Sequence, residues 1–251
     1  MRIGYNPVKW IKGVATPATI TVAVLNYIPF LSGFYAEMLD VLKTTLGRIH
    51  ETADLPFDLM VFDNGSCQEV QDYLLEEYRQ GRIQFLLLSE KNLGKGGAWN
   101  IIFNAAPGEV LSYTDNDVYF KTGWLSKSVD LLETFPNVGM VTARPIRTLE
   151  ELCTSTVEWA RQEPAARVES GHFSSWEAYY EFELSLGKEE GARQRYDESC
   201  DVKISYNGLD ALAGASHWQF TAYKKVVQQF LPFGMDRPMG QVIRLDQRMN
   251  E

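Results

Sequence analysis

Residues Glu109–Asp117, with the sequence EVLSYTDND, decide how this chain folds. The first half of the stretch is apolar and typical of a buried strand, and two carboxylates follow where that strand should end. Residues two apart in an extended backbone point to the same side, so Asp115 and Asp117 can share one cation. Mg²⁺ and Mn²⁺ prefer oxygen ligands and keep positions open for phosphates. The stretch therefore predicts a divalent metal site, and the competing interpretation is a polar turn after a strand.

Strands and helices alternate on both sides of this stretch. Such alternation is typical of a mostly parallel sheet that helices cover on both faces. The expected strands are 20–25, 57–62, 83–88, 110–114 and 138–142, and the expected helices are 34–48, 68–80, 98–105 and 124–135.

Polar clusters follow four of these strands. They are Asn26 and Tyr27, residues 63–66 (DNGS), residues 92–97 (NLGKGG) and residues 115–117. In parallel sheets, ligands bind beyond the carboxyl ends of the strands. The four clusters are therefore expected to meet at one ligand-binding edge.

Two of these clusters have a chemistry of their own. Asp63 can cap the helix that follows it or accept hydrogen bonds from a base or a ribose. Gly94 permits close approach of the backbone to a ligand, and Lys95 beside a helix N-terminus favours an anion. Lys95 is thus either a phosphate or ribose contact or a solvated loop lysine.

The alternation stops after residue 145. Residues 148–205 are rich in Glu, Arg, Tyr and Trp and are expected to be mainly helical. A strand at 215–223 and helices at 224–230 and 241–250 follow. We expect an N-terminal arm (1–18), a nucleotide-binding half (19–145) and an acceptor-side half (146–251) that is truncated at its C-terminus.

Composition limits the class of protein. The 251 residues carry a formal net charge of −9, which argues against a general nucleic-acid surface. The sequence has no apolar run long enough to span a membrane. Its three cysteines are widely spaced, which predicts a reducing cytoplasm, with peripheral contact at the inner face of the membrane as a variant.

Residues 19–145 resemble the inverting family-two glycosyltransferases of the GT-A fold. The resemblance implies a Rossmann-like three-layer α/β/α body with an added helical, aromatic region. It also implies that Asp63 contacts the nucleotide base, that Asn26 and Tyr27 lie near the nucleotide, and that Asn92 and Gly94 lie near ribose and sugar. Asp115, Asn116 and Asp117 match the Asp-x-Asp motif, in which the aspartates hold Mn²⁺ or Mg²⁺ against the diphosphate.

The general base is less clearly marked. The family has a late acidic residue, for which Asp246 is the first candidate and Asp236 the second. If the Arg-Leu pair that follows it in the family is aligned with Arg248 and Met249, the base instead falls near Gln241. Some GT-A enzymes use a late histidine as a third metal ligand, which makes His217 a candidate. A core or acceptor-loop histidine is the alternative.

The predicted function is metal-dependent, inverting transfer of a sugar from a UDP-, GDP- or dTDP-linked donor to a hydroxyl of a glycan, lipid-linked or protein acceptor. A non-catalytic domain that binds sugar nucleotides or glycans is the main alternative. A nucleotidyltransferase is a weaker one, because a basic glycine-rich loop after the first strand is missing. A dinucleotide oxidoreductase is disfavoured, because the glycine-rich fingerprint of that class does not follow the first strand of this chain.

Overall fold

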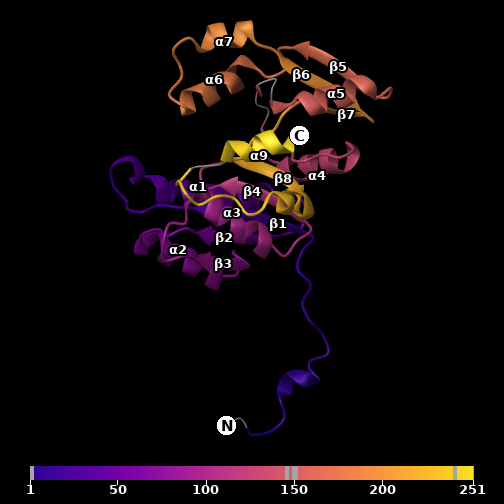
Figure 1. Ribbon diagram of the computed structural model, residues 1–251. Coiled ribbons are helices and arrows are strands. Elements are labelled where there is room, and N and C mark those ends of the chain that lie inside the picture. The colour runs from indigo at the N-terminus through magenta and orange to yellow at the C-terminus, as the bar shows by residue number, and fades with distance from the viewer. Residues whose placement is uncertain (1–2, 145–146, 149–151, 240–241, 251) are drawn as a thin grey trace.

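A five-stranded sheet forms the centre of the computed structural model, which describes residues 3–144, 147–148, 152–239 and 242–250 (Figure 1). The strands are β1 (Ile20–Asn26), β2 (Phe57–Asp63), β3 (Phe85–Leu88), β4 (Val110–Asp115) and β8 (Gln219–Tyr223). Their order is β3-β2-β1-β4-β8. All neighbouring pairs are parallel except β4 and β8. The predicted α/β fold with a mostly parallel sheet is confirmed.

Helices cover both faces of this sheet. Val22 and Val24 of β1 face one hydrophobic core, and Ala23 and Leu25 face the other, as the alternation of a strand requires. The first core includes side chains of α1 (Met38–Thr52), α2 (Gln68–Arg79) and α4 (Trp124–Thr134). The second includes side chains of α3 (Gly94–Ala105), α8 (Lys224–Val227) and α9 (Val242–Met249). We call this three-layer α/β/α unit the body.

A smaller unit, the lobe (residues 152–213), stands above the body in Figure 1. Its antiparallel sheet contains β5 (Arg167–Gly171), β6 (Asp201–Tyr206) and β7 (Leu209–Leu212) in that order. Its helices are α5 (Thr154–Gln162), α6 (Trp176–Ser185) and α7 (Ala192–Glu198). The end of α9 contacts the lobe, because Asn250 Oδ1 accepts hydrogen bonds from the backbone and the hydroxyl of Ser155.

The prediction of a mainly helical region at 148–205 was incomplete, because it missed the lobe sheet. Only Val168 of β5 is a large apolar residue, so this strand offers no apolar run to recognise. A local signal did exist: Asn207 and Gly208 join β6 to β7 with φ values of 47° and 84°. An Asn-Gly pair with both residues at positive φ is the favoured two-residue hairpin turn.

Several other elements differ from expectation, among them β8, which starts at Gln219 and not at residue 215. The predicted strand at 138–142 is absent, and only Val141 makes an isolated bridge, to Thr221 of β8. The helix expected from Phe34 starts at Met38 after the 3-10 turn η2 (Gly33–Tyr35), whose glycine has a φ of 55°. Helix α3 starts at Gly94, earlier than expected.

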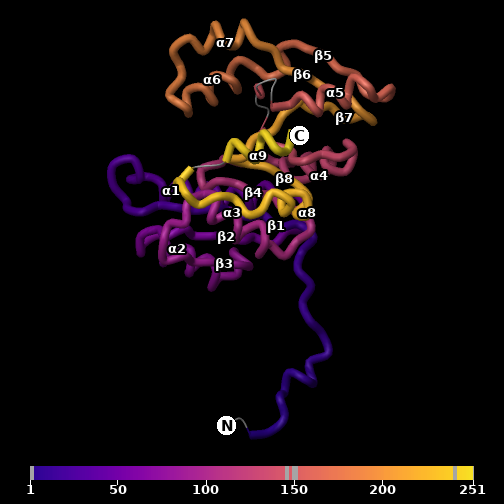
Figure 2. Tube along the Cα trace, in the orientation of Figure 1, coloured from indigo at the N-terminus to yellow at the C-terminus, as the bar shows by residue number. Residues whose placement is uncertain are grey.

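The halves predicted from the sequence are interleaved in space. Phe220 of β8 and Leu245 of α9 belong to the same core as α3. Only the lobe stands apart, and the described part of the predicted arm, with a short 3-10 turn η1 (Pro7–Trp10), runs away from the body (Figure 2). A further 3-10 turn, η4 (Gln228–Phe230), follows α8. The domain boundaries themselves stay a prediction.

Candidate active site

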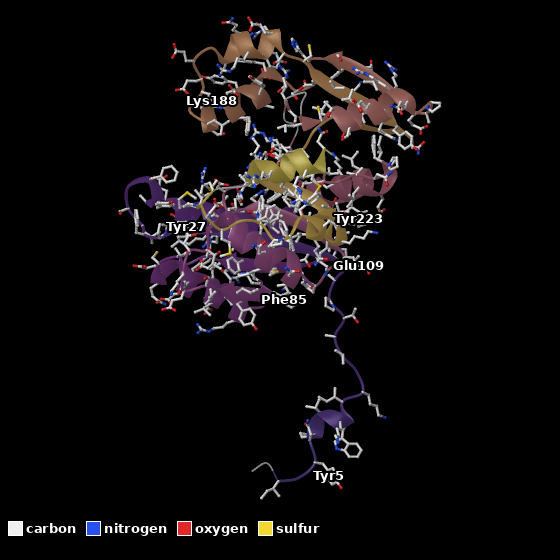
Figure 3. The ribbon with its side chains drawn as sticks, viewed as in Figure 1. Tyr5, Tyr27, Phe85, Glu109, Lys188 and Tyr223 are labelled. Carbon is white, nitrogen blue, oxygen red and sulfur yellow. The ribbon has the colours of Figure 1, made fainter. Side chains whose placement is uncertain are left out.

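The carboxyl ends of the parallel strands meet at one edge of the body. Asn26 at the end of β1 pairs in register with Asp63 at the end of β2, and Leu25 pairs with Asp115 at the end of β4. In Figure 3 this edge is the side on which Tyr27 lies, and Glu109, just before β4, lies at the opposite side. The topology therefore brings together three of the polar clusters that the sequence marked.

Asn26 is the buried centre of this edge. Its Nδ2 donates to Asp63 Oδ1 at 2.7 Å and to Ser66 Oγ at 3.0 Å. Its Oδ1 accepts from Asn116 Nδ2 at 2.7 Å. The Asn26 side chain thus ties the ends of β1, β2 and β4 together. Tyr27, the next residue, is half-buried and packs edge-on against Tyr35.

Asp63 is fully buried and saturated with hydrogen bonds. Besides Asn26, its carboxylate accepts from the backbone N–H of Ser66 at 3.1 Å and from Gln71 Nε2 at 3.3 Å. These contacts hold the turn before α2, but they do not cap the helix as the sequence allowed, because the N-cap residue of α2 is Cys67 and no side chain caps it. A contact between Asp63 and a nucleotide base stays a prediction.

The start of α3 is covered by a C-terminal segment. Asn92 Oδ1 accepts from the backbone N–H of Gly94 at 2.7 Å, which holds the turn into the helix. The backbone N–H of Lys95 donates to Pro238 O at 2.8 Å. Residues 234–239 therefore lie on the glycines that were expected to face a ligand, and Asp236 within them is an exposed candidate whose Oδ2 lies 3.9 Å from Arg237 Nε.

Lys95 faces the metal motif and not the solvent. Its buried Nζ lies 2.7 Å from Asp115 Oδ2 and sits over the rings of Trp99 and Tyr113. Asp115 Oδ1 accepts from the Tyr113 hydroxyl at 2.6 Å. Burial and the charge of Asp115 hold the pKa of Tyr113 well above its ordinary value, so the phenol stays protonated and donates. Asp115 is thus fixed by a cation on one oxygen and a hydroxyl on the other.

Asp117 is the more accessible carboxylate of the motif. It lines a pocket of about 380 Å³ together with Glu37, Asp40 and Thr45 of the α1 region. Although part of its side chain is exposed, desolvation by its surroundings and the charge of Asp115 raise its pKa. The two carboxylates therefore sense each other, and the charge of Lys95, which acts in the opposite direction, does not outweigh these two effects on the pKa of Asp117.

His217 and Asp246 form a second pair just before β8. His217 Nδ1 and Asp246 Oδ2 are 2.6 Å apart, and the ring of Trp99 lies against His217. Asp246 is buried, and its Oδ1 has no hydrogen-bond partner among the residues described, whereas the His217 side chain is 22% exposed. The pair adjoins the metal motif, because Trp218 O accepts from the Asp115 backbone N–H at 3.0 Å.

Comparison with known proteins now assigns the family. The sequence profile described as "Glycosyl transferase family 2" matches residues 33–184, more than half of the chain. The chain belongs to this family. The resemblance to the family-two glycosyltransferases that the sequence predicted is thereby confirmed, and the enzyme class expected of the chain is that of this family.

Individual relatives are distant. An uncharacterized glycosyltransferase of Nostoc sp. is 28% identical over 123 residues, which span 49% of this chain and 35% of that protein. Glucosyl-3-phosphoglycerate synthase from Mycobacterium tuberculosis, solved with Mn²⁺, UDP and glucosyl-3-phosphoglycerate, is 16% identical over 92% of this chain and 66% of that one (TM-score 0.47). The mannosyltransferase PcManGT from Pyrobaculum calidifontis, solved with GDP-Man and Mn²⁺, is 22% identical over 56% and 41% (TM-score 0.42).

The carboxylate oxygens of Asp115 and Asp117 are suitable ligands for a divalent cation. Asp115 Oδ2 lies 2.7 Å from Lys95 Nζ, so a bound cation would share this carboxylate with the ammonium. Asp117 adds a second carboxylate, and carboxylate oxygens are the ligands that Mg²⁺ and Mn²⁺ take. Within the described ranges no three His, Cys, Asp or Glu side chains converge on one point, so His217 does not join the two aspartates as a third ligand in this conformation.

Sequence reasoning missed how some of these residues act. Gln71 was not singled out, although its side chain bonds Asp63. Asn116 was expected near the nucleotide, but its side chain is buried against Asn26. Asp246 and His217 were separate candidates, and no spacing rule predicts that residues 29 apart share a hydrogen bond. Gln241 lies outside the described residues.

Gly96→Ala is expected to destabilise the protein by about 1–3 kcal/mol, because overpacking forces the backbone to shift. A Cβ at this position would lie 2.5 Å from Gly234 O in the segment that covers α3. Thermal denaturation should show a lower Tm. Gly47→Ala is the matched control, since a Cβ there meets nothing within 4 Å, and helix propensity predicts a gain of about 0.5–1 kcal/mol. An unchanged Tm for Gly96→Ala would contradict the contact between this segment and α3.

Proposed function

We propose that this chain is an inverting, metal-dependent glycosyltransferase that uses a nucleotide-diphospho-sugar. The observation that carries the proposal is the group formed by Asp115, Asp117 and Lys95 at the carboxyl edge of the parallel sheet. A UDP-, GDP- or dTDP-linked donor brings a diphosphate, and this edge is where such sheets bind their ligands.

Asp115 and Asp117 would hold Mg²⁺ or Mn²⁺. When bound, the ion supplies Lewis-acid stabilisation of the negative charge on the leaving diphosphate. Lys95 is the fixed cation of the site, because it is buried and stacked over Trp99 and bonded to Asp115. Asn26, through Asp63 and Asn116, keeps the strand ends in position so that the carboxylates stay at the edge.

The His217–Asp246 pair is our choice for the proton acceptor. The buried Asp246 carboxylate accepts the Nδ1 proton of His217, which leaves Nε2 to take the proton of the attacking hydroxyl. Asp246, which the sequence proposed as the base itself, then acts as a positioning residue. Attack from the side opposite the leaving diphosphate in one step inverts the anomeric centre.

His217→Ala and Asp246→Asn are expected to lower kcat by about 10²–10⁴-fold without weakening donor binding, because they remove proton transfer and its orientation. Steady-state kinetics tests this together with calorimetric titration of the donor: kcat should fall while the donor Kd stays unchanged. His172→Asn, an exposed histidine of the lobe, is the control. A wild-type kcat in His217→Ala would refute the base assignment.

The function itself is tested by release of nucleoside diphosphate. With Mn²⁺ and a panel of UDP-, GDP- and dTDP-linked sugars, we expect one donor to raise the Tm by mass action and to be slowly hydrolysed. Binding without any hydrolysis would favour the alternative, a sugar-nucleotide-binding domain without catalysis.

No helix of the described residues is both long and apolar enough to cross a membrane. Cytoplasmic location stays a prediction from the cysteine content.

A further inference from the structure

A cavity of about 820 Å³ lies between the body and the lobe. The body contributes α4, residues 135–144 and the end of α9, and the lobe contributes α5, Phe173 and β7. This volume is in the range of pockets that hold small molecules. The cavity exists only because the lobe stands on the body, so neither unit could form the site alone.

The interior of the cavity is mostly apolar. Leu131 and Val138 of the body and Trp159 and Leu212 of the lobe line it while only half-buried, so they keep apolar surface in a concave space. Burying such surface against a ligand gains roughly 25 cal/mol per Å². The cavity therefore favours an apolar group.

The charged residues of the lining do not favour a charged ligand. Lys127, Asp130 and Asp210 are exposed, and they mix both signs. The two half-buried cations are engaged within the protein: Lys203 Nζ lies 3.0 Å from Glu169, and Arg144 donates to the carbonyl of Ala178 at 2.7 Å. A charged group would lose its hydration there without a dedicated partner.

The cavity adjoins the proposed proton acceptor. Asp246, which bonds His217, is one of its lining residues. Gly214 and Ala215, which line it as well, directly precede Ser216 and His217 in the chain. A molecule in the cavity thus lies next to the pair that is to take its proton.

We infer that this cavity binds the uncharged, apolar part of the acceptor. The acceptor is then a small amphiphile, with a hydroxyl-bearing head presented to His217 and an alkyl or aromatic portion between the body and the lobe. A free polysaccharide chain would leave the apolar walls unused. The inference rests on the proposed function, because it takes the transferred sugar to arrive from the carboxyl edge of the sheet.

The test compares binding of n-octyl β-D-glucoside, below its micelle concentration, with binding of glucose by titration calorimetry of the full chain. Ala211→Trp and Val138→Phe fill the cavity from its two sides, and Leu184→Trp adds a large side chain at an exposed position of α6 outside it. Donor binding with Mn²⁺ is measured in parallel, and circular dichroism checks that each variant folds.

The wild type and Leu184→Trp should bind octyl glucoside at least about tenfold more tightly than glucose, since apolar burial favours the alkyl chain. The two filled variants should lose at least about tenfold of that affinity and keep donor binding. Equal affinity for octyl glucoside and glucose in the wild type would overturn the inference, as would full octyl glucoside affinity in the filled variants. Failure of the wild type to bind any donor would instead overturn the proposed function, and the comparison of octyl glucoside with glucose would still decide the cavity.

Discussion

Replacing Asp117 by Asn is expected to abolish Mn²⁺-dependent donor binding and to lower kcat/KM by about 10²–10³-fold or more, the usual cost of losing one electrostatic contact to a transition state. The measurement is calorimetric titration of the donor with and without Mn²⁺, followed by initial rates. Asp72→Asn, an exposed carboxylate on α2, is the matched control. Metal-dependent binding that survives in Asp117→Asn would remove the basis of the proposed function.

Asp117 is a cleaner target than Asp115 because of Lys95. Removing the Asp115 carboxylate leaves the buried ammonium of Lys95 without its partner at 2.7 Å. Breaking a buried pair in this way typically costs about 3–5 kcal/mol, so lost binding could reflect lost folding. Within the part of the chain that the structure describes, no cation forms an ion pair with Asp117.

Because the pKa of Asp117 is raised, a Tm measurement can distinguish lost metal binding from lost folding in Asp117→Asn. A carboxylate whose pKa is higher in the folded protein binds its proton more tightly in that state. Ionisation of Asp117 therefore lowers the free energy of unfolding as the pH rises from the pKa of the unfolded chain, about 3.9, through the raised pKa of the folded protein. At pH 7.5 that penalty is fully present. Asp117→Asn removes it, and we therefore expect a Tm equal to or above that of the wild type together with lost metal binding.

Replacing Asp201 by Ala is expected to destabilise the lobe by about 3–5 kcal/mol, because it leaves a buried guanidinium unpaired. Asp201 accepts from Arg147 at 3.2 Å through both oxygens and from the backbone N–H groups of Phe173 and Ser174. The side chains of Arg147 and Asp201 are only 6% and 1% exposed. Chemical denaturation measures the loss, and hydrogen exchange shows whether it is confined to the lobe.

Asp197→Ala is the control for this prediction. Asp197 pairs with Arg193 on the exposed surface of α7. Exposed pairs of this kind contribute at most about 1 kcal/mol. If Asp201→Ala lowered the free energy of unfolding no more than Asp197→Ala does, the Arg147–Asp201 pair would not stabilise the lobe as we expect.

The same pair gives the lobe a pH dependence. Burial alone would raise the pKa of Asp201, but the hydrogen bonds from Arg147 and Ser174 outweigh it and hold the pKa below its ordinary value. Stability from this group is therefore complete above the unfolded pKa of about 3.9 and is lost as pH falls through the lowered folded value. Acid denaturation of Asp201→Ala should lack this component.

Much of the body was predictable because its signals are local. Strands such as Ile20–Asn26 are buried on both faces and read as uninterrupted apolar runs, and Asp63 and Asp115 end their strands within the sequence itself. The lobe sheet was missed because its strands are short and polar on one side. The hairpin at Asn207 and Gly208 was its one strong local signal.

Contacts between distant residues account for what the sequence could not predict. Lys95 was expected at a phosphate or in solvent, and the structure places it against Asp115. Asp246 was expected to be the general base itself, and the structure buries its side chain and places it 2.6 Å from His217 Nδ1. The roles of these residues depend on which neighbour they meet, and that neighbour lies 20 or 29 positions away.

The amino-acid sequence by itself determined the parallel sheet, the edge at which the polar clusters gather and the family to which the chain belongs. These follow from periodicity and from residue order, which act over a few positions. Only the tertiary structure decided the partners of Lys95, Asp63, His217 and Asp246 and created the cavity between the body and the lobe. Pairing and concave shape arise where elements pack against each other, and the packing depends on side chains contributed by the whole chain.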